Sequence, residues 1–62
     1  MTIKVFYKNK NILCDIFNDV ENRYHKNGFY CIYLGDNNVV KISQKEIVKI
    51  EENGKSIAGF DK

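Results

Sequence analysis

Short runs in which apolar and polar residues alternate make up most of this sequence. Residues 3–8 and 12–17 alternate in this way, and residues 29–34 form an uncharged run rich in aromatic and β-branched side chains. A period of two is typical of a β-strand with one buried face. The chain contains no proline, so its turns depend on Gly, Asn and Asp. The pattern predicts a mainly β fold built from hairpins.

Five strands are predicted, at residues 3–8, 12–17, 29–34, 39–42 and 47–50. The segment Gly-Asp-Asn-Asn at residues 35–38 predicts a tight turn, because these residues tolerate positive φ. Ser43 and Glu46 have the spacing of a capping box, which predicts one helical turn near residues 43–46. Residues 19–27 interrupt the alternation, and we expect a short helix capped by Asp19 or a polar loop there.

The length of 62 residues allows only one hydrophobic core. We expect a single domain over residues 1–52 and a C-terminal tail over residues 53–62, which contain two glycines and few large apolar residues. A core of this size supplies about 3–5 kcal/mol of stability. Self-association into a homo-oligomer, most simply a dimer, is therefore expected.

The order of hairpin, long connection, hairpin, helical turn and short strand resembles the small barrels of the Src-homology-three-like (SH3-like) and Sm-like type. Residues 39–50 carry most of this resemblance, because a one-turn helix there joins the last two predicted strands. The resemblance covers residues 2–52 and implies a small five-stranded barrel. The Asp and Asn of the Sm RNA-binding loops are not identifiable in this chain. The resemblance therefore implies a fold and not a function.

Strand alternation predicts a core that includes both cysteines. Cys14 and Cys31 are expected to be buried, reduced thiols, with a disulfide or a reactive or metal-binding role as the alternatives. Together with His25 they give three soft ligands, one fewer than a structural zinc site needs. We therefore predict no metal and no cofactor. The predicted core comprises Ile3, Val5, Ile12, Cys14, Ile16, Tyr30, Ile32, Leu34, Val40, Ile42, Val48 and Ile50.

Charge and hydropathy exclude several classes of protein. Ten Lys and Arg oppose eight Asp and Glu, and the net charge of +2 does not demand a polyanionic partner. No apolar run reaches the length of a membrane span, so we predict a cytoplasmic protein without a membrane partner. No glycine-rich phosphate loop and no nucleophile–base pair are found, and so small a domain leaves little room for a cleft. The chain is predicted not to be an enzyme.

The aromatic residues that alternate away from the predicted core are the candidate binding residues. They would form either an exposed surface or a second small core. Aromatic anchors commonly carry most of the energy of an interface, and lysines beside them could neutralise phosphates. The predicted surface is centred on Phe17, Phe29 and Tyr33, with Phe6, Lys4 and Lys8 at its border.

A binding module is the function class that fits these observations. Protein–protein interaction or self-assembly is the first expectation, in the setting of a phage or mobile-element protein that inhibits a host system or sequesters its ligand. Single-stranded nucleic-acid binding is the alternative, because lysines are interleaved with the aromatic residues. A small ligand at an oligomer interface also remains open.

Overall fold

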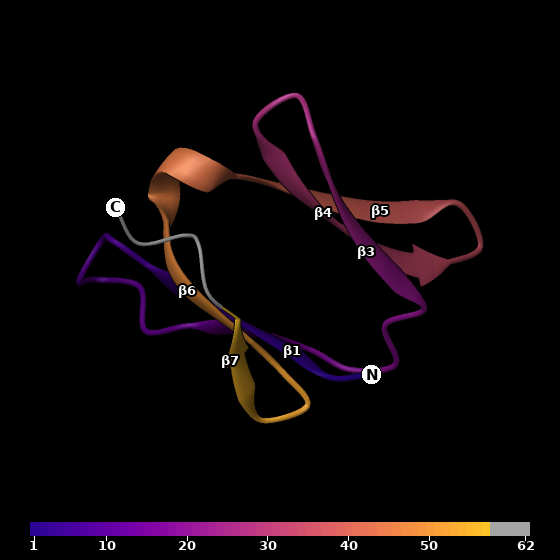
Figure 1. The fold of residues 1–62 in the computed structure, drawn as a ribbon, viewed down its shortest axis with the longest axis horizontal. Coiled ribbons are helices and arrows are strands. Elements are labelled where there is room, and N and C mark those ends of the chain that lie inside the picture. The colour runs from indigo at the N-terminus through magenta and orange to yellow at the C-terminus, as the bar shows by residue number, and fades with distance from the viewer. Residues whose placement is uncertain (58–62) are drawn as a thin grey trace.

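The computed structural model describes residues 1–57, which form two antiparallel sheets joined by the connection at residues 18–21 and by one 3₁₀ turn (Figure 1). The four-stranded sheet has the order β2-β1-β6-β7, with β1 at Ile3–Tyr7, β2 at Asp15–Phe17, β6 at Ile47–Glu52 and β7 at Lys55–Ile57. The three-stranded sheet has the order β3-β4-β5, with β3 at Asn22–Lys26, β4 at Phe29–Gly35 and β5 at Asn38–Ser43. The mainly β prediction is confirmed. None of the helical segments in the described part of the chain is long and apolar enough to span a membrane.

Two-residue turns close three of the hairpins. Asn27-Gly28 joins β3 to β4, Asp36-Asn37 joins β4 to β5, and Asn53-Gly54 joins β6 to β7. Both residues of every turn have positive φ, between 51° and 85°. Type I′ turns require this conformation and match the twist of the flanking strands, and Asn, Asp and Gly adopt it at the lowest cost. The turn predicted at residues 35–38 is confirmed.

The segment 19–27 contains a strand, so the prediction of a short helix or loop there is wrong. Asn22–Lys26 pairs with β4 from Asn22 opposite Tyr33 to Lys26 opposite Phe29. The turn at Asn27-Gly28 brings the segment alongside β4, where its backbone groups find interstrand partners. Asp19, expected as a helix cap, has a φ of 57°. Val20 is buried in the core, although its neighbours along the chain are exposed.

The predicted tail and the predicted five-stranded barrel also need correction. Residues 55–57 form β7, because the Asn53-Gly54 turn folds them back onto β6. The remainder of the expected tail, residues 58–62, lies outside the described residues. Over residues 1–57 the strands form two sheets and no closed barrel. The helical turn between β5 and β6 is confirmed at Gln44–Glu46 (η1), although Ser43 makes no side-chain cap hydrogen bond.

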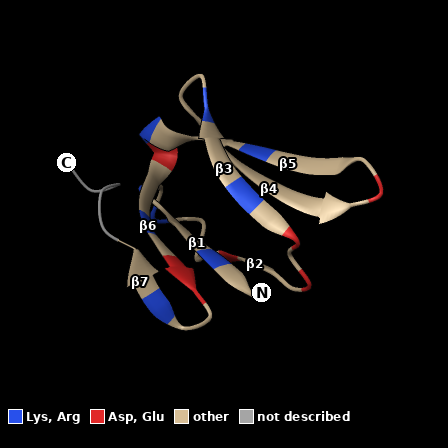
Figure 2. Ribbon diagram, turned by 45° about the vertical axis from the view of Figure 1, so that its right-hand side comes forward, with Lys and Arg blue, Asp and Glu red and all other residues tan. Residues whose placement is uncertain are grey.

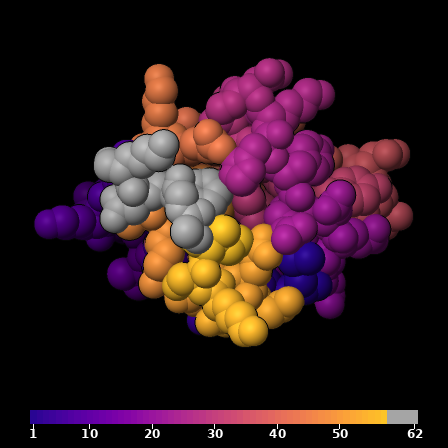
Figure 3. Space-filling model, viewed as in Figure 1, coloured from indigo at the N-terminus to yellow at the C-terminus, as the bar shows by residue number. Residues whose placement is uncertain are grey.

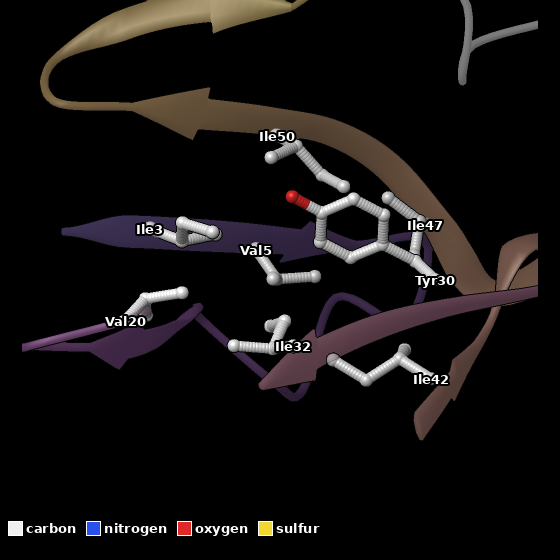
Figure 4. Close-up of a cluster of buried hydrophobic side chains, with 8 residues drawn as sticks. All are labelled: Ile3, Val5, Val20, Tyr30, Ile32, Ile42, Ile47 and Ile50. Atoms are coloured by element: carbon white, nitrogen blue, oxygen red, sulfur yellow. The ribbon is translucent and has the colours of Figure 1, made fainter. Parts of the chain in front are cut away.

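The core lies between the two sheets (Figure 4). Side chains from β1 and β6 of one sheet meet side chains from β4 and β5 of the other, and Tyr7, Phe17, Leu34, Val40 and Ile57 pack against them partly buried. Burial of this apolar surface is the main favourable contribution to folding. The buried cluster comprises Ile3, Val5, Val20, Tyr30, Ile32, Ile42, Ile47 and Ile50.

The second strand faces the core with the opposite set of residues from the predicted one. Pairing with β1 places Phe17 opposite the buried Ile3 and Ile16 opposite Lys4. Ile16 is therefore exposed. Residues 12–14 of the predicted strand lie before β2 in a loop, where Ile12 is exposed and Cys14 is half-buried instead of fully buried. A shift of one residue in the alternation exchanges the two faces of a strand. The prediction that Phe17 points away from the core is wrong for this reason.

An irregularity in β6 explains a second exchange. Phe6 lies opposite Lys49 and Tyr7 lies opposite Ile47, so Val48 is an extra residue in the ladder. A bulge of this kind interrupts the alternation of side chains. Ile47 and Ile50, three residues apart, are both fully buried, whereas Val48 is only half-buried. Ile47 takes the place in the core predicted for Val48.

Matched substitutions test the observed register of β2. Ile50→Val should lower the free energy of unfolding by about 0.5–1.5 kcal/mol, because it deletes a buried methylene. Ile16→Val should change it by less than about 0.5 kcal/mol, because Ile16 is 53% exposed. Urea denaturation followed by circular dichroism measures both. Equal losses in the two variants would instead support a core that contains Ile16.

Candidate functional site

The outer face of the three-stranded sheet is an ordered array of three rows. Residues paired across antiparallel strands point to the same side of the sheet, so the register defines each row. The three rows are Asn22–Tyr33–Val39, Tyr24–Cys31–Lys41 and Lys26–Phe29–Ser43, each written in the order β3, β4, β5. We call these nine residues the aromatic–lysine face.

The aromatic–lysine face combines exposed rings with positive charge. Phe29 is 42% exposed and Tyr24 39%, and Tyr33 is half-buried. Lys26 and Lys41 are exposed on the two outer strands, and none of the nine residues is acidic. Figure 2 shows the basic segments of this sheet on β3 and β5 and the acidic segments at the β4–β5 turn and just before β3. The face is therefore aromatic and locally cationic.

A hollow of about 360 Å³ opens on this face. Lys26 and Asn27 border it from the end of β3, Lys41 borders it from β5, and Phe29 and Cys31 contribute from β4. Cys31 is only 1% exposed and is a free thiol, as predicted. The chemical groups around the hollow are thus two ammonium groups, one amide, one aromatic ring and a buried thiol.

The outer face of the four-stranded sheet differs because its charged and aromatic groups already contact one another. The register places Lys4, Phe6, Lys49 and Glu51 on this face. The Lys49 ammonium lies 4.5 Å from the centre of the Phe6 ring and 3.3 Å from a Glu51 carboxylate oxygen. A cation over a ring and a neighbouring carboxylate satisfy each other locally. This face is consequently less suited to an anionic ligand.

The structure separates the six predicted binding residues. It brings Phe29 and Tyr33 together on the aromatic–lysine face. Phe6 and Lys4 lie on the outer face of the other sheet, Phe17 packs against the core, and Lys8 follows β1 in a loop.

Sequence reasoning missed Tyr24, Lys26 and Lys41 as members of this surface. Tyr24 and Lys26 belong to the segment that was predicted to be a helix or loop. The Asn-Gly turn at residues 27–28, directly before the strongly predicted strand at residues 29–34, was the signal that could have identified a hairpin partner there.

A second exposed patch consists of aliphatic residues beside the edge strand β2. Leu13 is 87% exposed, and Ile12 and Ile16 are also exposed. Ile12 and Leu13 belong to the segment between β1 and β2, which Figure 3 shows projecting at the left of the molecule, away from the β3–β4 hairpin. We call these three residues the aliphatic patch. It carries no aromatic ring and is separate from the aromatic–lysine face.

The two sheets are linked by an ion pair at the margin of the core. The Nε of Arg23 on β3 donates to Oε2 of Glu52 on β6 at 2.5 Å, and Nη2 donates to Oε1 at 3.0 Å. Tyr30, whose hydroxyl lies 3.5 Å from Oε2 of Glu52, contacts the His25 ring at 5.2 Å between centroids. Burial raises the pKa of the Tyr30 hydroxyl to about 12. The contacts among Arg23, His25, Tyr30 and Glu52 thus link β3, β4 and β6.

Neither a metal-ligand cluster nor a known relative assigns a function to the described residues. Within residues 1–57 no group of three or more His, Cys, Asp or Glu side chains is placed to hold a metal ion. Comparison with protein-family models, curated proteins and solved structures finds no match. The surface chemistry of the chain therefore carries the functional inference.

The Arg23–Glu52 pair should make stability depend on acid pH. Hydrogen bonds from Arg23 hold the pKa of the Glu52 carboxyl below its ordinary value of 4.5. Because the folded pKa is the lower one, this stabilisation is complete above about pH 4.5 and is lost as the pH falls through the folded value. Wild type should lose more free energy of unfolding between about pH 6 and pH 3 than Arg23→Gln does.

Urea denaturation at several pH values measures this difference. Lys45→Gln is the matched control, because it removes one positive charge from the exposed 3₁₀ turn and leaves the pair intact. It should follow the wild-type pH dependence. Parallel curves for wild type and Arg23→Gln would show that the pair does not link the sheets energetically.

Proposed function

We propose that this chain is a small non-enzymatic binding module that binds single-stranded nucleic acid on the aromatic–lysine face. One observation carries the proposal: exposed aromatic rings and two lysines share a sheet face on which none of the nine residues is acidic. Protein binding was the first expectation from the sequence. The composition of this face favours the alternative, because lysine is depleted in protein interfaces.

The proposed chemistry combines stacking with charge neutralisation. Unpaired bases stack on aromatic side chains, each contributing about 1–3 kcal/mol irrespective of its sequence. Tyr24 and Phe29 offer such rings on neighbouring strands, in adjacent rows of the face. Lys26 and Lys41 lie at its two sides, where they can contact a sugar–phosphate backbone that passes over the rings. A double helix would not expose its base faces to these rings.

The finer fold assignment is part of the same proposal. Strands β5 and β6, joined by a single 3₁₀ turn, support an SH3-like or Sm-like arrangement. The shared core between the sheets is consistent with a small barrel that is open along one side. We also propose that the chain is a cytoplasmic phage or mobile-element protein that inhibits a host system or sequesters its ligand.

Self-assembly or protein binding through the aliphatic patch is a second candidate function. Its support is the 87% exposure of Leu13, with Ile12 and Ile16 exposed close by. Apolar side chains beside an edge strand favour association, because the edge carries unpaired backbone groups. This contact would leave the aromatic–lysine face free.

Fluorescence anisotropy with a labelled single strand of about 12 nucleotides tests the proposed function. Two phosphate contacts predict a slope of about −1.4 in a plot of log affinity against log salt concentration. Lys26→Gln or Lys41→Gln should each reduce the magnitude of the slope by about 0.7. Tyr24→Ala or Phe29→Ala should weaken binding by about 1–3 kcal/mol.

Two controls separate this face from general charge and aromatic content. Lys55→Gln removes the same charge from β7, and Phe6→Ala removes a ring from the other sheet. Both should bind like wild type once circular dichroism has shown that they are folded. No measurable binding by wild type at low salt, or equal losses in the control variants, would refute the proposed function.

Sedimentation velocity over a range of concentrations tests the second candidate. Wild type should form a dimer as its concentration rises, and Leu13→Ser should weaken the dimer, because Leu13 is the most exposed apolar side chain of the patch. Leu13→Met keeps the apolar area and should behave like wild type. A wild-type mass that stays monomeric at all concentrations would contradict self-assembly.

A further inference from the structure

We infer that the hollow beside Phe29 is a seat for one nucleotide, with its base against the Phe29 ring, its phosphate between Lys26 and Lys41, and its base edge at the Asn27 amide. This inference rests on the proposed function and places one nucleotide of the bound nucleic acid at the hollow. It also adds Asn27 as a residue that contacts the base edge.

The arrangement of the two lysines supports a phosphate position. Lys26 lies directly opposite Phe29 on β3, and Lys41 lies opposite Cys31 on β5, one row away. Strands are about 4.8 Å apart, so β3 and β5 are separated by roughly 10 Å across β4. Two lysine side chains rooted at this separation can reach the one phosphate of a free mononucleotide from both sides, whereas in a longer single strand each lysine can contact a different phosphate. None of the residues 1–57 that line the hollow carries a carboxylate that would compete for them.

The size and lining of the hollow suit a base next to that phosphate. Its volume of about 360 Å³ lies in the range of sites for small ligands. Phe29 presents a ring that is 42% exposed, and the nearly inaccessible Cys31 contributes to the floor. A planar ring can therefore stack on Phe29 and exclude water from the hollow.

Among the described residues that line the hollow, Asn27 has the one neutral side chain with both a strong donor and a strong acceptor. It occupies the first position of the β3–β4 turn with a φ of 52°, which holds its backbone at the rim of the hollow. The neighbouring N6 donor and N7 acceptor of adenine match an asparagine amide. Uracil offers an equally matching pair in its N3–H donor and O4 acceptor, so the expected preference for an adenine nucleotide over a uracil nucleotide rests on the larger ring system that adenine stacks on Phe29.

Nuclear magnetic resonance titrations of the ¹⁵N-labelled full chain with 5′-AMP, 5′-UMP, adenosine and inorganic phosphate test the seat. AMP should shift the amide signals of residues 26–31 and of Lys41 and should bind more tightly than the other three probes. Equal affinity for AMP and phosphate would reduce the site to a simple anion site and overturn the inference. Shifts confined to the four-stranded sheet would also overturn it.

Three variants identify the roles of the lining residues. Lys26→Gln and Lys41→Gln should each weaken AMP about twofold to fivefold and leave adenosine nearly unchanged. Asn27→Gly retains a residue that tolerates positive φ, and it should weaken AMP and UMP alike without unfolding the hairpin. Lys55→Gln should have no effect. An unchanged affinity of Asn27→Gly for AMP would contradict a contact between Asn27 and the base.

The oligonucleotide experiment distinguishes this inference from the proposed function. If the single strand binds through Tyr24, Phe29 and the two lysines while AMP causes no shifts on the face, the seat is wrong and the proposed function stands. If neither the single strand nor AMP binds, both are wrong.

Discussion

The division of β4 between two faces is the constraint on which the rest of the structure depends. Phe29 to Leu34 contains no charge, so both faces of this strand are apolar. Tyr30 and Ile32 enter the core between the sheets and are almost fully buried. Alternation then leaves Phe29, Cys31 and Tyr33 on the opposite face, where the strands of residues 1–57 form no further sheet. Phe29 remains exposed and Tyr33 half-buried on this face, whereas Cys31 is buried. Burial on one side thus produces an aromatic surface on the other.

Both sheets carry lysines and aromatic rings on their outer faces, but the lysines have different electrostatic surroundings. On the four-stranded sheet a lysine lies over Phe6 and beside Glu51, so ring, cation and carboxylate are mutually satisfied. On the three-stranded sheet Lys26 and Lys41 share their face with rings and with no acid among the nine residues. Similar residue types therefore give one face on which Lys49 is already paired with a carboxylate and a ring, and one on which both lysines lie beside rings with no acid among the nine residues. Net charge alone, at +2, conceals this local separation.

The tight turns could be predicted from the sequence more fully than the strands that they connect. The hairpin at residues 35–38 and the helical turn near residues 43–46 follow from local chemistry, and both were predicted. The Asn-Gly turns at residues 27–28 and 53–54 use the same chemistry, yet the strands beside them, β3 and β7, were not recognised. Asn22–Lys26 is exposed throughout, so it has no pattern of buried residues, and β7 has only three residues. Their partners, β4 and β6, stabilise them.

The sequence by itself determined the mainly β character, the position of β4, the hairpin between β4 and β5, and a core containing Ile3, Val5, Tyr30, Ile32, Ile42 and Ile50, because period-two burial and turn preferences are local properties. Only the tertiary structure decided which face of β2 turns inward, that Ile47 replaces Val48 in the core, and that Tyr24, Lys26 and Lys41 join Phe29 and Tyr33 on one surface. These features depend on the register between strands far apart in the sequence, and a shift of one residue exchanges the two faces of a strand. Alternation within a single strand contains no information about that register.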